Sequence, residues 1–400
     1  MHNSANKTLR VMQVHSRYRR SNPSGENRVV ELERKALSAL GVEVSEFVIE
    51  GDQESVLSRY FNALMTPWNP LVGRAFRRRM QEIRPHIVHV HNLFPNVSPS
   101  ILPHAHAAGA KVVMTLHNYR WFCSSATAFR DHAPCYRCQS GNLKWGLRHR
   151  CYKDSFPASL IASAFVASLR RQSHHIDRIL ALSNAQFEVL QNAGIAPARM
   201  RIKPNFNPNI EPPPLAWSQR RGDAIFIGRL DEEKGVLALL DCWQDMGMAA
   251  PKLDIIGSGP LEQELHRRLS ANPQLAAQIR VHGQLPRRET MTLLGHARLL
   301  LMPSLWRETF GLSVLEALGC GVGVVTLAGS GPDDMVKPGV NGMRLKHPPH
   351  QWAANLLKLF EQGNPTLQNW ADQAAQSISD IHLPAQNAVA LRAIYRDLLA

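Results

Sequence analysis

Short apolar runs alternate with helical stretches along the first half of the chain. A helical pattern over Glu26–Leu40 follows the first of these runs. Strands that alternate with helices in this way are typical of a parallel sheet with helices on both faces. The first half therefore predicts a doubly wound α/β lobe. Its strands are expected at residues 9–15, 42–49, 86–92, 111–118 and 178–184.

A segment rich in proline and asparagine, KPNFNPNIEPPP at residues 203–214, interrupts this alternation and has the composition of a linker. A second series of apolar runs follows it, at residues 223–230, 252–257, 279–284, 298–304 and 323–329. We therefore predict two Rossmann-like lobes, residues 1–205 and 206–384. A C-terminal helix at residues 385–400 is expected to pack back on the first lobe. Ligands of such sheets bind beyond the carboxyl ends of the strands, so we expect the site in a cleft between the lobes.

Length and composition restrict the class of protein. The chain has 400 residues, of which 44% are apolar, and this is ordinary for a globular protein with two domains. No apolar run reaches the roughly 20 residues that span a bilayer. The N-terminal residues lack the apolar core of a signal peptide, which predicts a cytoplasmic protein. Its six cysteines are then expected as thiols or metal ligands.

Charge is distributed unevenly between the two halves. Residues 1–205 carry 28 Lys and Arg against 13 Asp and Glu, whereas the rest of the chain is nearly neutral. This asymmetry predicts an anionic partner for the first lobe. A nucleic-acid-binding protein is the competing interpretation. It would require basic residues interleaved with stacking aromatics or a known binding module, and the sequence has neither, so we expect no nucleic-acid partner.

Two cations follow the first strand of the second lobe. In IFIGRLDEEKG, residues 225–235, the strand runs through Gly228 into a turn that carries Arg229 and Lys234. A guanidinium and an ammonium placed this closely at the start of a helix suit a diphosphate. An ordinary solvated loop with two basic residues is the alternative.

Two acids lie eight residues apart in RETFGLSVLEALGCG, residues 307–321. Gly311 lets the backbone turn into a helix, whose N-terminus carries about half a positive charge and binds phosphate oxygens. Glu308 precedes this turn and Glu316 lies within the helix. The two acids could act as a glycosidase acid/base pair. With cations nearby, they could instead accept hydrogen bonds from hydroxyls on the two sides of a diphosphate, as in a nucleotide sugar.

The segments GRLDEEKG, IIGSGP, VHGQLP and LMPSLWRETFGLSVLEALGCGVGVV together resemble the C-terminal lobe of family 4 retaining glycosyltransferases of the polysaccharide-assembly type. These enzymes have the GT-B fold, in which two Rossmann-like lobes face a central cleft. The resemblance implies that Arg229 and Lys234 neutralise the donor diphosphate. It also implies that Glu308 binds the donor sugar and Glu316 the ribose hydroxyls. Further donor-binding residues implied in this way are Gly25, Gly228, Phe310, Gly311 and Leu312.

The first lobe contributes two elements to this resemblance. RYRRSNPSGENRVVELERKAL, residues 17–37, resembles the family's glycine-rich loop and the helix that follows it, with Gly25 as the residue that corresponds. TLHNYRWFC places His117 at the end of a strand. In the family, a histidine at this point lies beside the anomeric region of the donor sugar, although a lone histidine is more often structural. The candidate catalytic residues are therefore His117, Arg229, Lys234 and Glu308. The implied reaction is retaining transfer from a UDP- or GDP-sugar, with no cofactor essential for catalysis.

Four cysteines occur in an insertion at about residues 120–155. Cys123, Cys135, Cys138 and Cys151 have the spacing C-x11-C-x2-C-x12-C. Four thiolates can close a tetrahedral structural zinc site. Four reduced cysteines in a packed loop are the alternative.

The acceptor is expected to be anionic because the first lobe is basic. A glycan linked to a lipid diphosphate at the inner face of the cell membrane fits this charge and the family resemblance, and a soluble sugar acceptor is the alternative. Residues 74–84 form a basic helical segment and residues 156–172 an apolar one that is too short to span a bilayer. Either segment could bind an anionic membrane surface peripherally, but residues 156–172 could equally form a buried helix.

Overall fold

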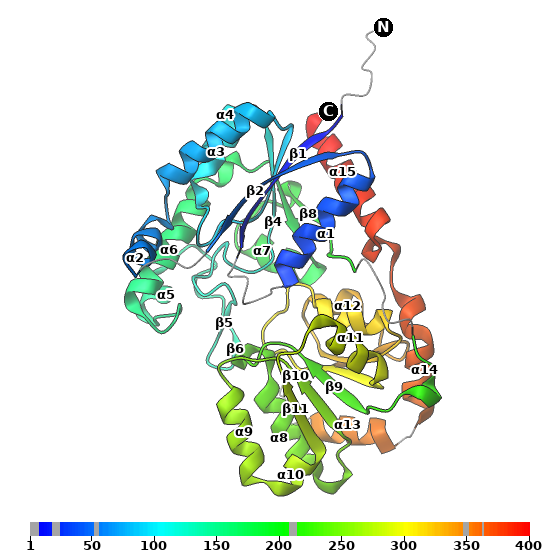
Figure 1. The fold of residues 1–400 in the computed structure, drawn as a ribbon. Helices are drawn as coiled ribbons and strands as arrows, with labels where there is room; N and C mark the ends of the chain where they lie inside the picture. The colour runs from blue at the N-terminus through cyan, green and yellow to red at the C-terminus, as the bar shows by residue number, and fades with distance from the viewer. Residues whose placement is uncertain (1–7, 18–24, 52–55, 208–213, 347–351, 362–363) are drawn as a thin grey trace. The chain divides into compact units, whose positions relative to one another are not determined.

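The computed structural model describes residues 8–17, 25–51, 56–207, 214–346, 352–361 and 364–400 (Figure 1). These residues form two compact units, divided between Phe206 and Asn207. Each unit contains a six-stranded parallel sheet, which confirms the predicted α/β class. Most of the predicted glycine-rich loop (residues 18–24) and the middle of the predicted linker (residues 208–213) lie outside the described residues.

The sheet of the first unit has the strand order β2-β1-β3-β4-β7-β8. The central strands form because they are continuous buried runs, as parallel strands covered on both faces require. All six residues of β3 are buried, for example. The strands are β1 (Arg10–Arg17), β2 (Glu43–Glu50), β3 (Ile87–Asn92), β4 (Lys111–Thr115), β7 (Arg178–Ala181) and β8 (Met200–Ile202).

Helices cover this first sheet, and two of them that are distant in sequence lie side by side on one face (Figure 1). These two are α1 (Gly25–Ala39) and α15 (Pro384–Leu399), and the buried Leu37, Leu391 and Tyr395 pack with strand residues into one core. The other helices of the unit are α2 (Val56–Met65), α3 (Pro70–Ile83), α4 (Leu102–Ala107), α5 (Lys144–Arg148), α6 (Phe156–Arg171) and α7 (Asn184–Asn192).

The second unit repeats the architecture with the strand order β11-β10-β9-β12-β13-β14. The order reverses between β9 and β12, and doubly wound sheets bind ligands beyond the carboxyl ends of the strands at such a point. The strands of this sheet are β9 (Ala224–Ile227), β10 (Leu253–Ile256), β11 (Ile279–Gly283), β12 (Leu299–Met302), β13 (Gly323–Leu327) and β14 (Gly342–Leu345).

The fully buried Trp243 lies in the core of this second unit, and its indole N–H donates a hydrogen bond of 2.9 Å to the carbonyl oxygen of Pro251. The helices of the unit are α8 (Val236–Met246), α9 (Glu262–Ala271), α10 (Pro273–Gln278), α11 (Arg287–His296), α12 (Leu312–Gly319), α13 (Trp352–Glu361) and α14 (Asn364–Ala374).

The cysteine-containing insertion is divided between the units. Its short hairpin, β5 (Phe129–Arg130) and β6 (Ala133–Pro134), groups with the second unit, whereas the sequence prediction placed the whole insertion in the first lobe. The difference arises from contacts that the sequence does not reveal. His132 Nδ1, for instance, lies 2.6 Å from a carboxylate oxygen of Glu232.

Two further features bear on the sequence predictions. Helix α6 buries one face, including Phe165 and Val166, and leaves Phe156 and Leu160 about half exposed at its N-terminal end. Within the described ranges, no helix has both the length and the apolar character needed to cross a membrane.

Candidate active site

Lys234 and Glu308 form an ion pair in the second unit. Lys234 ends a short 3-10 turn after β9, and Glu308 lies in the loop after β12. Gly235 allows this approach: its φ is +74°, and a Cβ atom there would lie 2.1 Å from the carbonyl oxygen of Pro303. The two loops are also joined by a hydrogen bond of 2.8 Å from the Leu305 amide to the Glu233 carbonyl. The residue predicted to bind the diphosphate, Lys234, and the residue predicted to bind the donor sugar, Glu308, therefore lie next to each other.

The loop that carries Glu308 is almost completely buried. Glu308 itself is 5% exposed, and its carboxylate also accepts a hydrogen bond of 3.0 Å from the Ser304 hydroxyl. Gly311, with φ +93°, ends the loop and begins α12, where the side chain of Pro332 leaves no room for a Cβ. Phe310 is buried and Leu312 is the first residue of the helix. Backbone amides therefore approach the carboxyl end of β12, as an anion site at a helix N-terminus requires.

Glu316 has a cationic partner that the sequence did not indicate. Its carboxylate lies 2.6 Å from a guanidinium nitrogen of Arg287, the first residue of α11. Lys234 thus faces Glu308 and Arg287 faces Glu316, the two acids predicted to bind hydroxyls of the donor. Each carboxylate can accept hydrogen bonds from hydroxyls beside a positive charge.

Arg229, a predicted donor ligand, is exposed. Its side chain is 65% exposed, and its Nε lies 2.9 Å from a carboxylate oxygen of Asp231. Gly228, which precedes it, donates its amide to the Ile256 carbonyl at 3.0 Å. The loops after β9 and β10 pack backbone to backbone, because a Cβ on Gly257 would lie 1.8 Å from the Gly228 oxygen. Gly228 therefore has a packing role in addition to any contact with a ligand.

In the first unit, three neighbouring strands each have a histidine at or near the carboxyl end. His15 is on β1, His91 on β3, and His117 follows β4. Side chains two residues apart point to the same face of a strand. His91 therefore lies above His89 on the face that α1 and α15 cover, where Tyr395 reaches a nitrogen of His89 at 2.7 Å. His91 Nδ1 lies 3.1 Å from His117 Nε2, and the two rings are stacked.

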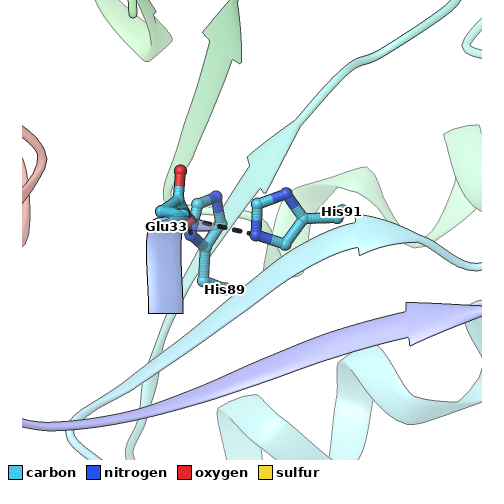
Figure 2. Close-up of side chains that lie close together, drawn as sticks. All are labelled: Glu33, His89 and His91. Atoms are coloured by element: carbon cyan, nitrogen blue, oxygen red, sulfur yellow. Dashed lines mark ion pairs between the residues drawn. The ribbon is translucent and has the colours of Figure 1, made fainter. Parts of the chain in front are cut away.

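The carboxylate of Glu33, on α1, lies at the centre of this group of histidines. Figure 2 shows its side chain facing His89 and His91, whose nitrogens lie 3.1 and 3.2 Å from Oε1. Lys203 Nζ lies 2.6 Å from the other carboxylate oxygen, and Gln13 donates to Oε1 at 3.1 Å. Glu33 and Lys203 are 1% and 2% exposed, so the ion pair is removed from water.

Burial and charge set the protonation of this group. Burial alone would raise the pKa of Glu33, but Lys203, His89 and His91 lower it well below its ordinary value. Burial, opposed only in part by Glu33, lowers the pKa of His91 to about 4. The pKa of His117 is also well below its ordinary value because of burial and the neighbouring His91. At neutral pH the carboxylate is therefore charged and these two imidazoles are neutral.

Glu26 and Arg120 lie at the same edge of the first sheet. Burial raises the pKa of Glu26 to about 8, although Arg120 and a hydrogen bond with Asn92 oppose the shift. Gly25, the predicted donor ligand beside it, is exposed and is the first residue of α1.

Two family models match the chain and together cover most of it. The model for Glycosyltransferase Family 4 matches residues 23–206, and the model for Glycosyl transferases group 1 matches residues 209–377. The chain belongs to the family 4 glycosyltransferases. This result confirms the family that the sequence motifs indicate.

Curated relatives match part of this glycosyltransferase. A 2-deoxystreptamine N-acetyl-D-glucosaminyltransferase of Niallia circulans is 30% identical over 126 residues, which are 31% of this chain and 32% of that protein. An O-antigen chain mannosyltransferase B of Escherichia coli is 32% identical over 114 residues, 28% of this chain and 29% of that protein. The chain thus spans about a third of the length of the curated relatives it matches.

Solved structures match nearly the whole chain. The crystal structure of Anabaena HepE in complex with UDP and glucose covers 97% of this chain and 100% of its own, with a TM-score of 0.67 and 15% identity. At this identity the likeness concerns the fold alone, and it confirms the predicted GT-B fold.

The four insertion cysteines of this glycosyltransferase lie near one another but are not as tightly grouped as metal ligands. All four are free thiols of intermediate burial. Burial raises the pKa of Cys138 to about 11, and the thiols of Cys123, Cys151 and Cys135 add to the shift. Among the described residues, the one group of three with its ligand atoms all within 4.8 Å is Glu33, His89 and His91.

Several polar residues that contact the predicted ones were not predicted from the sequence. Lys203 lies within the segment assigned to the linker, and Arg287 directly follows the segment VHGQLP without being part of it. Glu33 is one of several acids on an amphipathic helix. The histidines did carry a signal, because His89 and His91 occupy alternate positions of a strand that is otherwise apolar.

Proposed function

We propose that this protein is a retaining glycosyltransferase that moves a sugar from a UDP- or GDP-sugar to a glycan acceptor. The observation that carries the proposal is the pairing of two acids with two cations at the carboxyl edge of the second sheet. Glu308 with Lys234, and Glu316 with Arg287, offer hydroxyl acceptors beside positive charge. A nucleotide sugar has the complementary arrangement of hydroxyls around a diphosphate.

The same contacts favour sugar clamps over a glycosidase acid/base pair. A general acid has to donate a proton to the leaving oxygen, whereas both carboxylates here face cations and are placed to accept hydrogen bonds. We assign Glu308 to the donor sugar and Glu316 to the ribose, with Lys234 and Arg229 on the diphosphate. A ligand phosphate would compete with Glu308 for Lys234 and with Asp231 for Arg229. The Arg229 side chain is largely exposed, so its exchange of partners would cost little.

Charge stabilisation is the main catalytic contribution in this proposal. Lys234 and the N-terminus of α12 would stabilise the departing nucleoside diphosphate. The departing phosphate oxygen would accept the proton of the acceptor hydroxyl, so the reaction would need no essential metal. His117 would lie beside the donor sugar, as the family resemblance implies.

The relatives support the substrate class. Two of the curated relatives are named for transfer of N-acetylglucosamine and of mannose, the second in building the O-antigen chain. Anabaena HepE was crystallised with UDP and glucose. We propose by analogy that this protein acts in the biosynthesis of a surface polysaccharide or another glycoconjugate.

The test is turnover of UDP- and GDP-sugars by the purified full chain. Lys234→Ala removes a charge-assisted contact worth roughly 1.5–3 kcal/mol, so donor use should fall tenfold or more. Glu308→Gln should impair transfer and leave binding of free UDP or GDP nearly intact, whereas Glu316→Gln should weaken both. The control is Glu264→Gln, which disrupts an exposed pair with Arg267. No turnover with any nucleotide sugar, or an inverted product, would contradict the proposal.

We further propose an acceptor linked to a lipid diphosphate and peripheral binding at the cytoplasmic face of the membrane. The described surface of the first unit supports this with basic and apolar residues. Arg74, Arg77 and Arg78 are exposed on α3. Trp68 and Leu71, at the start of the same helix, are 44% and 56% exposed. Each basic residue near an anionic leaflet contributes about 1 kcal/mol.

Liposome co-sedimentation tests this membrane proposal. Binding to anionic vesicles should exceed binding to neutral ones and weaken at high salt. Replacing the three arginines by glutamine should abolish the difference, whereas Arg267→Gln, a change on the second unit, should not. Equal partitioning of the parent protein to both lipids, or none to either, would leave a soluble acceptor as the better proposal.

We propose a structural zinc ion at Cys123, Cys135, Cys138 and Cys151. The support is chemical: four thiols within electrostatic range of one another, one pair as CxxC, in a segment with little regular structure. Zinc would hold them as thiolates and fix the insertion. The thiols would have to close around the ion, because no three of the four sulfurs lie within 4.8 Å of one another.

A further inference from the structure

Three adjacent strands of the first unit place polar side chains along one face, toward their carboxyl ends. On β1 this face carries Gln13 and His15, and on β3 it carries His89 and His91. On β4 and just beyond it, Thr115 and His117 continue the row. His89 donates to or accepts from Thr115 Oγ1 at 2.8 Å. Polar groups this deep in a sheet are costly unless each is paired, so their arrangement is specific.

A line of contacts leads from Lys203 to His117. Lys203 lies 2.6 Å from Glu33 Oε2, and Glu33 Oε1 lies 3.2 Å from His91 Nε2. Within the described part of the chain, His91 Nε2 has no hydrogen bond of standard geometry. A proton on this nitrogen would point toward the nearby Glu33 carboxylate, which would then be its acceptor. The opposite nitrogen of His91 lies 3.1 Å from His117 Nε2. A charged carboxylate therefore connects through one imidazole to the predicted catalytic histidine.

Glu33, His89 and His91 could also be considered as ligands of a divalent cation. The surrounding donors argue against this. Lys203 places a positive charge on Glu33, and both nitrogens of His89 already have partners, Thr115 and Tyr395, at 2.8 and 2.7 Å. A dication would have to displace the buried ammonium. The cluster therefore fits a hydrogen-bonded relay better than a metal site.

We propose that Glu33 is a positioning residue that fixes, through His91, the tautomer and orientation of His117. Ionised Glu33 can only accept, so His91 carries its proton on Nε2 and presents a lone pair on Nδ1. His117 then donates its Nε2–H to that lone pair, which leaves Nδ1 as its acceptor nitrogen. Lys203 keeps Glu33 ionised, so Glu33 stays an acceptor toward His91 and the order of donors and acceptors along the line is maintained. The relay rests on the proposed function in one respect: His117 is taken to act on the donor sugar.

A substitution at Glu33 should reverse the donor and acceptor roles along the line of contacts. In Glu33→Gln the amide oxygen remains opposite the Lys203 ammonium, which needs an acceptor. The amide NH2 then occupies the position of Oε1 and donates to His91 Nε2. His91 would carry its proton on Nδ1 instead, and His117 would become the Nδ1–H tautomer, with its acceptor nitrogen turned toward His91.

Nitrogen-15 NMR of histidine-labelled full-length protein tests this directly. Chemical shifts of the two ring nitrogens distinguish the tautomers, and the His117 signals are assigned by their loss in His117→Asn. The parent protein should show His91 and His117 both protonated on Nε2 near neutral pH. The Nδ1–H form of either residue in the parent protein would overturn the proposal without any further variant.

Kinetics of the variants completes the test. Glu33→Gln should convert His117 to the Nδ1–H form and lower kcat about tenfold or more with a smaller change in KM, the scale of one well-aligned hydrogen bond. Glu33→Asp, which keeps the charge, should retain the parent tautomer and recover part of kcat. Tyr395→Phe is the matched control, because it removes an equally buried partner of His89 outside the line to His117. It should lower stability but leave the tautomer and kcat unchanged.

The readouts separate this inference from the proposed function. If the tautomers behave as expected but no nucleotide sugar is used, the relay stands and the proposed function fails. If sugar is transferred but Glu33→Gln leaves tautomer and kcat unchanged, the relay fails and the function stands. Loss of both the tautomer and kcat on treatment with a chelator would favour the metal site over the relay.

Discussion

Removing the Lys203 ammonium should destabilise the first unit severely. Lys203 and Glu33 are 2% and 1% exposed and 2.6 Å apart. Deleting one partner of such a pair leaves an uncompensated buried charge and costs about 3–5 kcal/mol. Gln13 and the two imidazoles still face the carboxylate, so we expect Lys203→Met to lose about 3 kcal/mol, the lower end of that range. At about 2–4 °C for each kcal/mol, the Tm should fall by about 6–12 °C.

Calorimetry and urea unfolding measure this loss, with two comparisons. Lys111→Met is the matched control: it removes an ammonium 3.4 Å from Asp177 in an exposed pair, and exposed pairs contribute about 0–1 kcal/mol. The double variant Glu33→Gln/Lys203→Met removes both charges and should regain most of the stability, giving a coupling of about 2–3 kcal/mol. A loss below about 1 kcal/mol in Lys203→Met, or losses that simply add in the double variant, would refute the reasoning.

The loss should also depend on pH. Lys203 is one of the charges that lower the pKa of His91 in the folded state, and its removal leaves the Glu33 carboxylate free to favour a proton on His91. The pKa of His91 is then lowered less than in the parent protein, so the variant should lose less stability than the parent protein as the pH falls below about 6.5. Lys203→Met should therefore be closer in stability to the parent protein at pH 6 than at pH 8. A stability difference that is larger at pH 6 than at pH 8 would mean that no proton near Glu33 compensates for the lost ammonium.

Three further outcomes are expected. In the parent protein, burial lowers the pKa of His15 and His91 to about 4, so the unfolded state binds protons first and stability should fall between about pH 6.5 and 4; a urea midpoint that stays level through this range would contradict it. Gly235→Ala should cost more than Gly283→Ala by urea unfolding, because both have positive φ but only the Gly235 Cβ would meet a carbonyl oxygen, at 2.1 Å. The parent protein should contain one zinc per chain by elemental analysis and Cys138→Ser much less; a metal-free parent protein would exclude the site.

Much of the fold could be predicted from alternation alone, and the misses have a physical reason. The strands expected in the two halves were found close to their predicted positions. The edge strands β8 and β14 were missed, and neither is a continuous buried run. Strand β8 also has two exposed residues, Arg201 and Ile202, so it lacks the buried run that identifies its neighbours.

The candidate site was only partly predictable. Lys234 and Glu308 belong to recognisable motifs, and the structure brings them into contact although they are 74 residues apart. Arg287 could not be found in the same way, since its pairing with Glu316 depends on where α11 begins relative to α12. The two units are described separately, so the sequence prediction of a site between them stays a prediction.

The histidines of the first unit show how a local pattern and a tertiary contact combine. Because side chains alternate between the two faces of a strand, the sequence HIVHVHN predicts that His89 and His91 lie on one face. Their chemistry, however, depends on Glu33 from α1 and on Lys203, which is 170 residues beyond Glu33. Lys203 directly follows the last strand of the unit, and the next residues are held by the C-terminal segment: Asn387 donates to the Pro204 carbonyl at 2.9 Å. The charge that sets the relay is thus fixed by the segment where the chain leaves the first unit and by the helix with which it returns. If the histidine tautomers depend on these two segments, the geometry at His117 is set only when the first unit has folded completely. The Lys203 and Glu33 variants test this dependence by removing one partner each of the buried ion pair.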